Sequence, residues 1–241
     1  MTERTTPARP GDTYADTWLI VPCFNEDAVV GDVIAQARQT FPNIVAVDDG
    51  SSDDSADRAR KAGAHLVRHP VNLGQGAALQ TGVEYARAQD GARRFVTYDA
   101  DGQHQVKDVE RMLGRLEDED IDIIIGTRFG DGHTEPTQVP LLKRIVLRTV
   151  VALSPRTRRL GLSDAHNGLR VFNAKVAGEL NLRMNGMSHA SEFVRLIDKN
   201  GWRVAEEPVD ILYTDYSRSK GQSLFNGVNI ISDEIIAGRL S

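Results

Sequence analysis

The sequence predicts an α/β domain with a mostly parallel central sheet and helices on both faces. From residue 18 onward, short runs of apolar and β-branched residues alternate with stretches of helical spacing. Acidic or glycine-containing turns follow several of these runs. Such β–α alternation is typical of parallel sheets, which are buried on both faces under crossover helices. At 241 residues the chain is long enough for one large domain with a substantial core.

The strand predictions rest on short apolar runs bounded by turn residues. The first run, residues 18–21, reads WLIV, and the second, residues 44–47, leads into the turn DDGSS. The other predicted strands are residues 65–68, 95–98, 121–126, 168–172 and 203–206, with an extended segment at 209–213. Right-handed crossovers would bring the turns at 22–27, 48–53 and 99–104 to one edge of the sheet, where their polar side chains would converge.

The helix predictions rest on the spacing of apolar residues and on capping residues. Apolar side chains recur at helical spacing in residues 26–39. Ser52 or Asp53 is expected to cap a helix over 54–62. The other predicted helices are residues 74–88, 106–117, 189–199 and 222–240. The last of these is amphipathic, so we expect it to dock on the body of the protein or to support a homodimer.

Composition narrows the class of protein. With 29 Lys and Arg against 34 Asp and Glu, the net charge of −5 argues against a nucleic-acid binder. The first dozen residues lack the apolar core of a signal peptide, and no run approaches the ~18 apolar residues that cross a bilayer. The single cysteine, Cys23, fits a reducing compartment and is expected to be a buried small residue rather than a nucleophile. We therefore expect a cytoplasmic protein, soluble or peripheral at the cytoplasmic membrane face.

The chain is expected to divide into a flexible N-terminal tail at 1–16, the main domain at 17–215, and a C-terminal loop and amphipathic helix at 216–241. Within the domain, residues 137–160 hold six basic residues and no acidic ones. Their apolar residues could form a wide helical stripe, which suits contact with an anionic membrane surface or a lipid phosphate. A core-packed helix with a solvated basic face is the alternative that the sequence leaves open.

Asp99 and Asp101 carry the strongest chemical signal. They follow the strand at 95–98 and lead into Gly102 and Gln103. Alternation along a strand would direct both carboxylates into one space, at the strand ends where open α/β sheets bind ligands. Two acids so close repel each other unless a cation or a proton lies between them. Oxygen ligands from two Asp and a Gln suit Mg²⁺ or Mn²⁺ bridging a substrate diphosphate, whereas the plain alternative is a surface turn with two solvated acids.

Seven motifs occur in order between about residues 20 and 223. They are VPCFNE (21–26), VDDGSSDDS (47–55), NLGQGAAL (72–79), DADGQH (99–104), GTRF (126–129), DAHNGLRVF (164–172) and EEPVDILYTDYSRSKGQS (206–223). Together they resemble the inverting family 2 glycosyltransferases of GT-A fold, and within them the dolichyl-phosphate mannose/glucose synthase-like branch, which glycosylates polyprenyl phosphates. No single motif is decisive, but the ordered set is specific.

The resemblance implies a nucleotide pocket formed by several turns. Asp49 stands where the family contacts the base or ribose, although Asp48 and Asp49 also suit plain turn chemistry. Phe24 replaces the more usual Tyr, so a hydroxyl contact is lost there while stacking is retained. The donor-binding residues implied by the resemblance are Pro22, Phe24, Glu26, Asp49, Gln75, Asp99, Ala100, Asp101, Arg218 and Lys220. The implied ligands for Mg²⁺ or Mn²⁺ are Asp99, Asp101 and Gln103.

The resemblance also implies an acceptor side. Arg128 and Arg144 fall at or near phosphate-binding positions of the family, and ordinary surface cations are the alternative reading. His166 and His189 are expected to be hydrogen-bonded structural residues that frame the acceptor. The residues assigned to catalysis are Asp101, Asp164, Glu192 and Arg128.

Three functions follow from these observations. The first is transfer of a hexose from a GDP-mannose or UDP-glucose type of donor to a polyprenyl phosphate, which arrives already anionic. The second keeps this donor but transfers to a sugar or glycan hydroxyl, which requires a general base such as Asp164 or Glu192. The third is a catalytically silent nucleotide-binding module that recruits partners, which the intact DADGQ motif disfavours.

Overall fold

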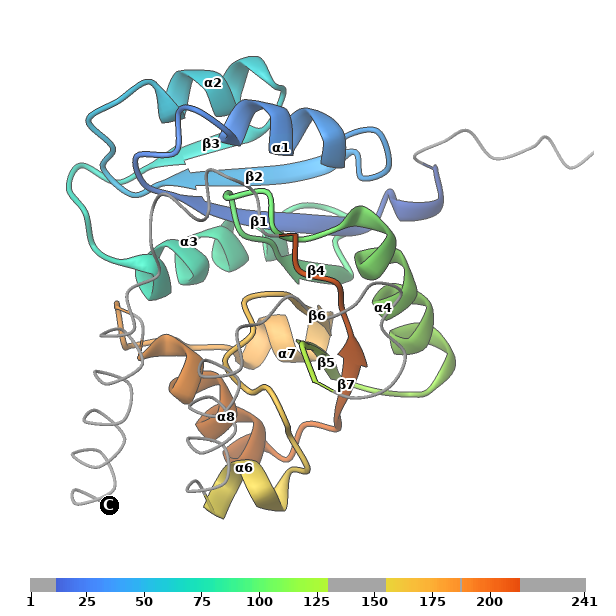
Figure 1. Cartoon of the computed structure of the whole chain (residues 1–241). Coiled ribbons are helices and arrows are strands. Elements are labelled where there is room, and N and C mark those ends of the chain that lie inside the picture. The colour runs from blue at the N-terminus through green and yellow to red at the C-terminus, as the bar shows by residue number, and fades with distance from the viewer. Residues whose placement is uncertain (1–11, 130–154, 187, 213–241) are drawn as a thin grey trace, which may run out of the picture.

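The structure is a computed structural model that describes residues 12–129, 155–186 and 188–212. These residues form a seven-stranded sheet with helices on both faces (Figure 1). The strand order is β3-β2-β1-β4-β6-β5-β7. In the described part of the chain only β6 runs antiparallel, to β4 and β5, and the other pairings are parallel. The predicted α/β class with a mostly parallel sheet is therefore confirmed.

Each predicted strand corresponds to an observed strand, with bounds that shift by at most two residues. The strands are β1 (Thr17–Cys23), β2 (Asn43–Asp48), β3 (His65–Arg68), β4 (Arg94–Thr97), β5 (Ile123–Thr127), β6 (Arg170–Asn173) and β7 (Val204–Pro208). Residues 209–212 leave the sheet after β7. The Leu212 N–H donates to the Gln103 carbonyl over 2.9 Å, so this segment runs beside the turn that follows β4.

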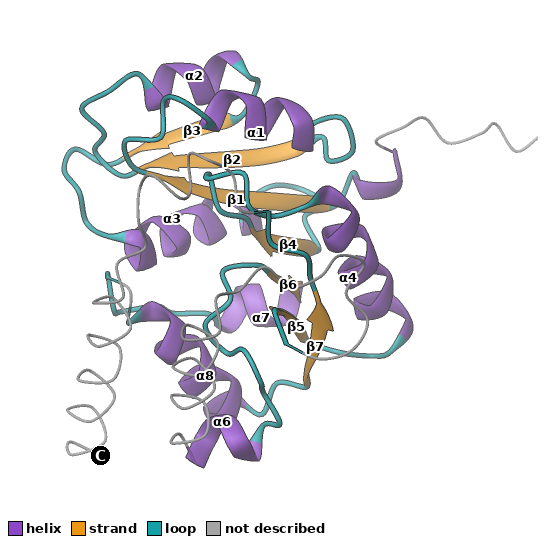
Figure 2. Ribbon diagram, in the orientation of Figure 1, coloured by secondary structure: helices purple, strands orange, loops and turns teal. Residues whose placement is uncertain are grey.

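The helices described by the structure are α1 (Val30–Ala37), α2 (Ser55–Lys61), α3 (Gln75–Arg87), α4 (Val106–Asp118), α6 (Pro155–Arg159), α7 (Ala174–Glu179) and α8 (His189–Asn200), preceded by a 3₁₀ turn at Asp12–Tyr14 (Figure 2). Helix α1 begins four residues later than predicted, and the N–H groups of Glu26 and Asp27 that precede it donate to the side chains of Ser55 and Asp53. The N-cap of α2 is Asp54 rather than Ser52 or Asp53, although the Asp53 carboxylate accepts the Ser55 N–H over 3.0 Å. The short α7 was not predicted.

The sheet separates two apolar cores. Alternate residues of β1, such as Ile20 and Leu19, are fully buried on opposite faces. One face packs on α3, α7 and α8, and the other packs on α1, α2 and α4. This two-sided burial explains the continuous apolar runs in the sequence.

The order of the strands reverses at β1. Strand β1 pairs with β2 on one side and with β4 on the other, both in parallel. Open α/β sheets bind ligands at such a switch point, outside the carboxyl ends of the strands. Phe24 directly follows the end of β1 here, and Asp99 follows the end of β4 by two residues. The topology thus brings two of the predicted site segments to one edge.

Residues 12–16, within the predicted N-terminal tail, rest on the body of the domain. The ring of Tyr14 lies 4.8 Å from that of Phe41, and Arg94 forms an ion pair with Asp16. Most of the basic segment, 137–154, and residues 213–241 lie outside the described residues, so Arg144, Arg218, Lys220 and the predicted terminal helix do as well. None of the described helices combines the length and apolar character that crossing a membrane requires.

Candidate active site

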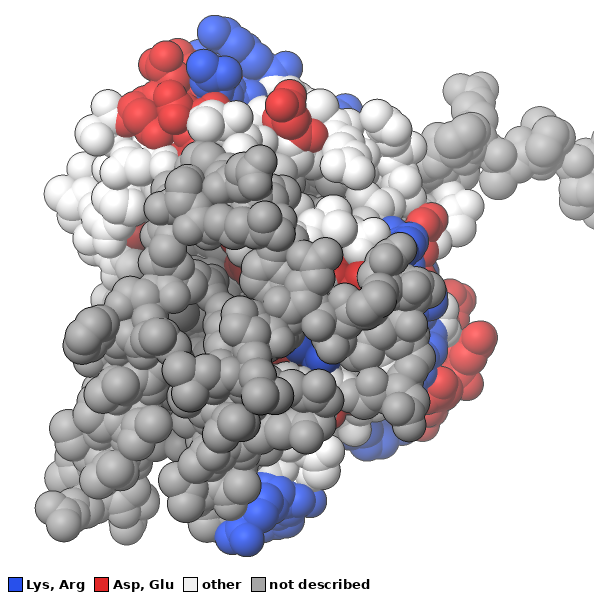
Figure 3. All heavy atoms as spheres, in the orientation of Figure 1, with Lys and Arg blue, Asp and Glu red and all other residues white. Residues whose placement is uncertain are grey.

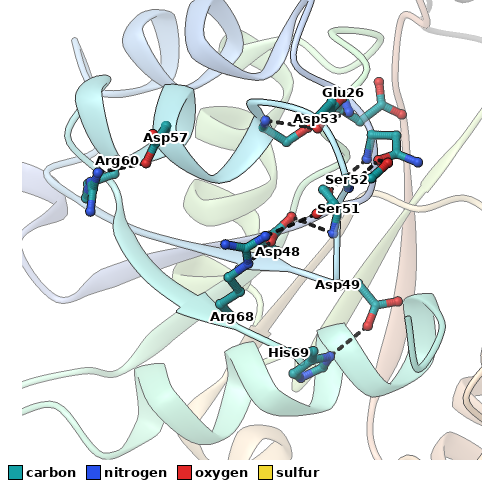
Figure 4. Close-up of polar contacts among 12 residues, drawn as sticks. Glu26, Asp48, Asp49, Ser51, Ser52, Asp53, Asp57, Arg60, Arg68 and His69 are labelled. Carbon is teal, nitrogen blue, oxygen red and sulfur yellow. Dashed lines mark hydrogen bonds and ion pairs between the residues drawn. The ribbon is translucent and has the colours of Figure 1, made fainter. Parts of the chain in front are cut away.

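The turn after β1 is fastened to the turn after β2 (Figure 4). The Asn25 N–H donates to Ser51 Oγ over 2.9 Å, and the Asn25 side-chain oxygen accepts the Ser52 N–H over 3.0 Å. The Glu26 N–H donates to Ser55 Oγ over 2.7 Å. Asn25 has a φ of +53°, in the left-handed region that Asn tolerates better than most residues. The predicted convergence of these two turns is confirmed.

Two of the predicted nucleotide-binding residues belong to β1 and its end. Pro22 is buried inside β1, beyond the last residue that pairs with β4. Phe24 is 43% exposed at the carboxyl end of the strand. An exposed aromatic ring at a sheet edge that binds ligands offers a stacking surface for a base.

The Asp49 carboxylate is buried and engaged by its own chain. It accepts the N–H of Leu73 over 2.9 Å and that of Gly74 over 2.7 Å, and His69 Nδ1 lies 2.7 Å away (Figure 4). The other ring nitrogen of His69 lies 3.0 Å from Thr81 Oγ1. Asp49 therefore positions the loop that starts α3. Its contact with a base or ribose stays a prediction.

Asp99 and Asp101 lie in the turn after β4 rather than on the strand, which ends at Thr97. The strand-alternation argument for their proximity was therefore wrong. The turn itself brings them together, since Gly102 adopts a φ of +74° and the Gln103 N–H donates to Asp101 Oδ1 over 3.0 Å. Ala100 between them is buried.

The two carboxylates differ in their surroundings. Gln75 donates to Asp99 Oδ1 over 3.2 Å, and His104 Nε2 lies 3.0 Å from Asp99 Oδ2. Burial alone would raise the pKa of Asp99, but its hydrogen bond with His104 and nearby positive charge outweigh burial and lower it. Burial and the charge of Asp99 raise the pKa of Asp101. Such repulsion between two acids is relieved by a cation.

The residues of this turn fit a divalent cation that shares its ligands with a substrate. The described residues gather no group of three His, Cys, Asp or Glu suited to hold a metal ion. Asp99 and Asp101 supply two carboxylates, and Gln103 would add an amide oxygen. Mg²⁺ typically binds through one or two carboxylates together with substrate phosphates and water, rather than in an all-protein cage. The donor set matches that mode.

A second group of residues lies at the end of β5. The buried Asp164 carboxylate accepts the Arg128 N–H over 2.9 Å and two guanidinium N–H groups over 2.6 Å each. The carboxylate of Glu206 on β7 holds this turn by accepting the N–H groups of Ser163 and Asp164 over 2.8 Å. Burial would raise the pKa of Asp164, but the charge and hydrogen bonds of Arg128 lower it. Asp164 is thus held ionised against Arg128.

Glu192 contacts the loop before α8 rather than either of these groups. Its Oε2 accepts the N–H groups of Arg183 and Met184, both over 2.8 Å, and its Oε1 pairs with Arg195 over 2.8 Å. The same loop contacts the start of α3, where the Gly76 N–H donates to the Asn185 carbonyl over 2.7 Å. The contacts of Glu192 are therefore those of a residue that supports the fold.

Substitution of Glu192 by alanine is expected to destabilise the fold by about 1–3 kcal/mol, because two backbone donors and Arg195 lose their partner. Glu192→Gln keeps an acceptor oxygen and should lose less stability while retaining activity. Urea denaturation and a transfer assay on both variants check this. A stable but inactive Glu192→Gln variant would instead indicate a catalytic base.

Sequence reasoning missed Arg170, and it missed the contact between His104 and Asp99. Arg170 interacts electrostatically with both Asp99 and Asp164, and so connects the two groups. Burial lowers the pKa of His166 and of His189 to about 4, and the charge of Arg170 adds to both shifts. Both histidines are therefore neutral at pH 7.

The predicted structural contacts of these histidines are present. Nδ1 of His189 lies 2.9 Å from the Gly186 carbonyl oxygen, and Nε2 of His166 lies 3.3 Å from Ser191 Oγ. These contacts are with the loop before α8 and with α8 itself. Each ring is therefore held by α8 or by the loop that precedes it.

Comparisons with known proteins agree with this arrangement. Residues 18–180 match the family model described as Glycosyl transferase family 2. An uncharacterized protein of Methanocaldococcus jannaschii is 34% identical over 90% of this chain and 89% of its own length. The UDP-N-acetylglucosamine–dolichyl-phosphate N-acetylglucosaminyltransferase of Methanococcus voltae is 28% identical over 88% of this chain and 92% of its own length.

A solved structure is also similar. It is glucosyl-3-phosphoglycerate synthase from Mycobacterium tuberculosis, in complex with Mn²⁺ and uridine-diphosphate-glucose. The TM-score is 0.69 at 18% identity, over 98% of this chain and 84% of that one. At this identity the likeness shows a shared fold.

Proposed function

The chain belongs to glycosyl transferase family 2, and on that premise we propose that it transfers a hexose from a nucleotide-diphosphate sugar to a polyprenyl phosphate. The predicted family, the glycosyltransferase class and the GT-A fold are confirmed. The relative from Methanococcus voltae is named for transfer to dolichyl phosphate, which is a polyprenyl phosphate. This supports the acceptor class.

The state of the two candidate bases favours an anionic acceptor over a hydroxyl. A hydroxyl acceptor requires a general base whose pKa lies near the working pH. The pKa of Asp164 is lowered and its carboxylate is taken by Arg128, while Glu192 accepts backbone N–H groups. A phosphate monoester has a second pKa near ~6, so its oxygens need orientation by cations more than deprotonation. The engagement of Asp164 and Glu192 by other groups of the protein is the observation that carries the proposal.

On the donor side, we propose that Asp99, Asp101 and Gln103 hold Mg²⁺ or Mn²⁺ against the diphosphate. When bound, the cation neutralises the charge that develops on the departing nucleoside diphosphate. The acceptor oxygen forms its bond to the anomeric carbon as the bond from that carbon to the diphosphate oxygen breaks, which inverts the configuration. Phe24 offers its exposed ring to the base, and we place Arg218 and Lys220 at the phosphates.

We propose that the protein meets its lipid acceptor as a peripheral protein at a membrane surface. Three basic residues of the segment 137–160 fall in α6, namely Arg156, Arg158 and Arg159, and all three are exposed. Arg156 and Arg159 each lie 3.2 Å from Asp198 of α8. Lys and Arg side chains gather at the end of the molecule that carries α6 (Figure 3). A basic surface of this kind is attracted to anionic lipids.

The test is a transfer assay with labelled GDP-mannose, UDP-glucose and UDP-N-acetylglucosamine. A short polyprenyl phosphate is supplied in anionic vesicles, with Mn²⁺, Mg²⁺ or EDTA. We expect one donor to give a lipid-linked product, EDTA to abolish the reaction, and the protein to sediment with the vesicles. A parallel arm offers free sugars and oligosaccharides. Product in that arm, with no lipid product from any donor, would refute the proposal.

A further inference from the structure

Arg170 is a buried cation whose hydrogen-bond donors are largely unpaired. It is 1% exposed and the largest fully buried side chain among the described residues. Within the described part of the chain, its Nε and Nη2 have no hydrogen-bond partner, and its Nη1 lies 3.5 Å from the Gly168 carbonyl oxygen. The guanidinium carbon lies 4.6 Å from the centre of the Phe193 ring. A buried charge with unpaired donors weakens a fold, so its presence calls for another explanation.

The sheet register puts Arg170 between the two halves of the site. It is the first residue of β6, the antiparallel strand between β4 and β5, and it pairs with Thr97 and Ile125. Asp99 follows Thr97 by two residues, and Arg128 follows Ile125 by three. Its burial lowers the pKa of Arg170 to about 10, while Asp99 and Asp164 both act to raise it. Arg170 is thus charged at neutral pH and close to both carboxylates.

The charges around Arg170 are otherwise unfavourable for an anionic acceptor. The site holds the three acids Asp99, Asp101 and Asp164. The Arg128 guanidinium donates to Asp164, and both nearby histidines are neutral at pH 7. With the proposed cation bound, Asp99 and Asp101 would be balanced, but the donor diphosphate would bring negative charge of its own. An approaching acceptor phosphate would therefore still meet more negative than positive charge. Such repulsion is strong in a poorly hydrated interior.

We propose that Arg170 is a charge-balancing residue, whose guanidinium offsets the repulsion between the net negative charge of the donor-loaded site and the phosphate of the acceptor. The inference rests on the proposed function, since it concerns an anionic acceptor. A water molecule that attacks the same donor carries no charge and meets no such repulsion. Arg170 should therefore matter for transfer to phosphate and not for slow hydrolysis of the donor.

The test compares Arg170→Met and Arg170→Lys with wild type. Three quantities are measured: the KM for a short polyprenyl phosphate, the rate of donor hydrolysis without acceptor, and the melting temperature. For Arg170→Met we expect the acceptor KM to rise about tenfold or more, hydrolysis to stay within about twofold, and the melting temperature to equal or exceed that of wild type. Arg170→Lys should be intermediate in KM, because it restores the charge without the planar fork.

Arg94→Met is the matched control. Arg94 starts β4 at the opposite end of the β4–β6 pair and bonds to Asp16 and the Thr13 carbonyl. It should lose stability while its ratio of transfer to hydrolysis stays at the wild-type value.

Three results for Arg170→Met would overturn the inference. They are an unchanged acceptor KM, a parallel loss of transfer and hydrolysis, and a melting temperature below that of wild type. Wild type that hydrolyses a donor but transfers to no polyprenyl phosphate would refute the proposed function, and the inference with it. Equal transfer by wild type and Arg170→Met refutes the inference alone.

Discussion

Replacement of Asp101 by asparagine is expected to lower kcat/KM for sugar transfer by about 10²–10³-fold, the usual effect of removing one group that stabilises developing charge. The carboxylate lies in the turn after β4, next to Asp99, where we propose that the cation binds. An asparagine keeps the shape of the side chain and loses the charge. Kinetics with saturating donor and a titration of Mn²⁺ should show weaker binding of the metal.

The same variant should be more stable than wild type in EDTA at neutral pH. Burial and Asp99 raise the pKa of Asp101 in the folded protein. The folded chain therefore holds a proton that the unfolded chain has released, so stability falls as pH rises from about 3.9, the ordinary Asp pKa, through the raised value. Above that pH window Asp101 is ionised in the folded protein, and its buried charge beside Asp99 lowers the stability of the fold. Asp101→Asn removes this charge and so restores the lost stability.

Thermal melts at pH 7 in EDTA check this second effect. Asp57→Asn is the control, because Asp57 forms an exposed pair with Arg60 that contributes little. That variant should match wild type in activity and nearly so in stability. Full activity of Asp101→Asn in Mn²⁺ would contradict the assignment of this turn to the metal.

Local patterns predicted the sheet well because each core strand is buried on both faces. Runs such as WLIV have no polar face, and this directly indicates a covered sheet. The antiparallel direction of β6 has no local signal, since the composition of a short strand does not encode its direction in the sheet. Helix α7 is too short for periodicity to reveal, although Asn173 marks its start by accepting the Val176 N–H over 3.0 Å.

The parts of the candidate site that are formed by residues close together in sequence could be predicted. The parts that are formed by the packing of separate segments could not. Asp99 and Asp101 stand in one motif, so a cation site could be predicted from the sequence alone. His104 ends the same motif, and that position was a usable signal for its contact with Asp99. Arg170 was read as part of an apolar strand, although a charged residue within LRVF is itself a sign of a special environment. The hydrogen bonds that Glu192 accepts from the N–H groups of Arg183 and Met184 have no sequence signature.

Substitution of Gly168 by alanine is expected to lower transfer about 10²-fold with little loss of stability. A Cβ at this position would lie 2.2 Å from Asp99 Oδ2 and 2.9 Å from Asp99 Cγ. The carboxylate must therefore move, which breaks its contacts with Gln75 and His104. Because the displaced atoms are the end of a side chain and not backbone, the fold should accommodate the change. Mn²⁺ titration, transfer kinetics and a thermal melt measure the three effects.

Gly114→Ala is the matched control for this substitution. Gly114 is exposed in the middle of α4, and a Cβ there would meet nothing within 4 Å. Alanine in a helix interior stabilises by up to about 1 kcal/mol relative to glycine, so this variant should melt higher and keep full activity. If Gly168→Ala also kept full activity and Mn²⁺ affinity, the observed position of the Asp99 carboxylate would not be the one used in catalysis. If it lost activity and stability together, Gly168 would serve the fold rather than the placement of Asp99. Only loss of activity and Mn²⁺ affinity at unchanged stability ties the close approach of these two residues to the chemistry of transfer.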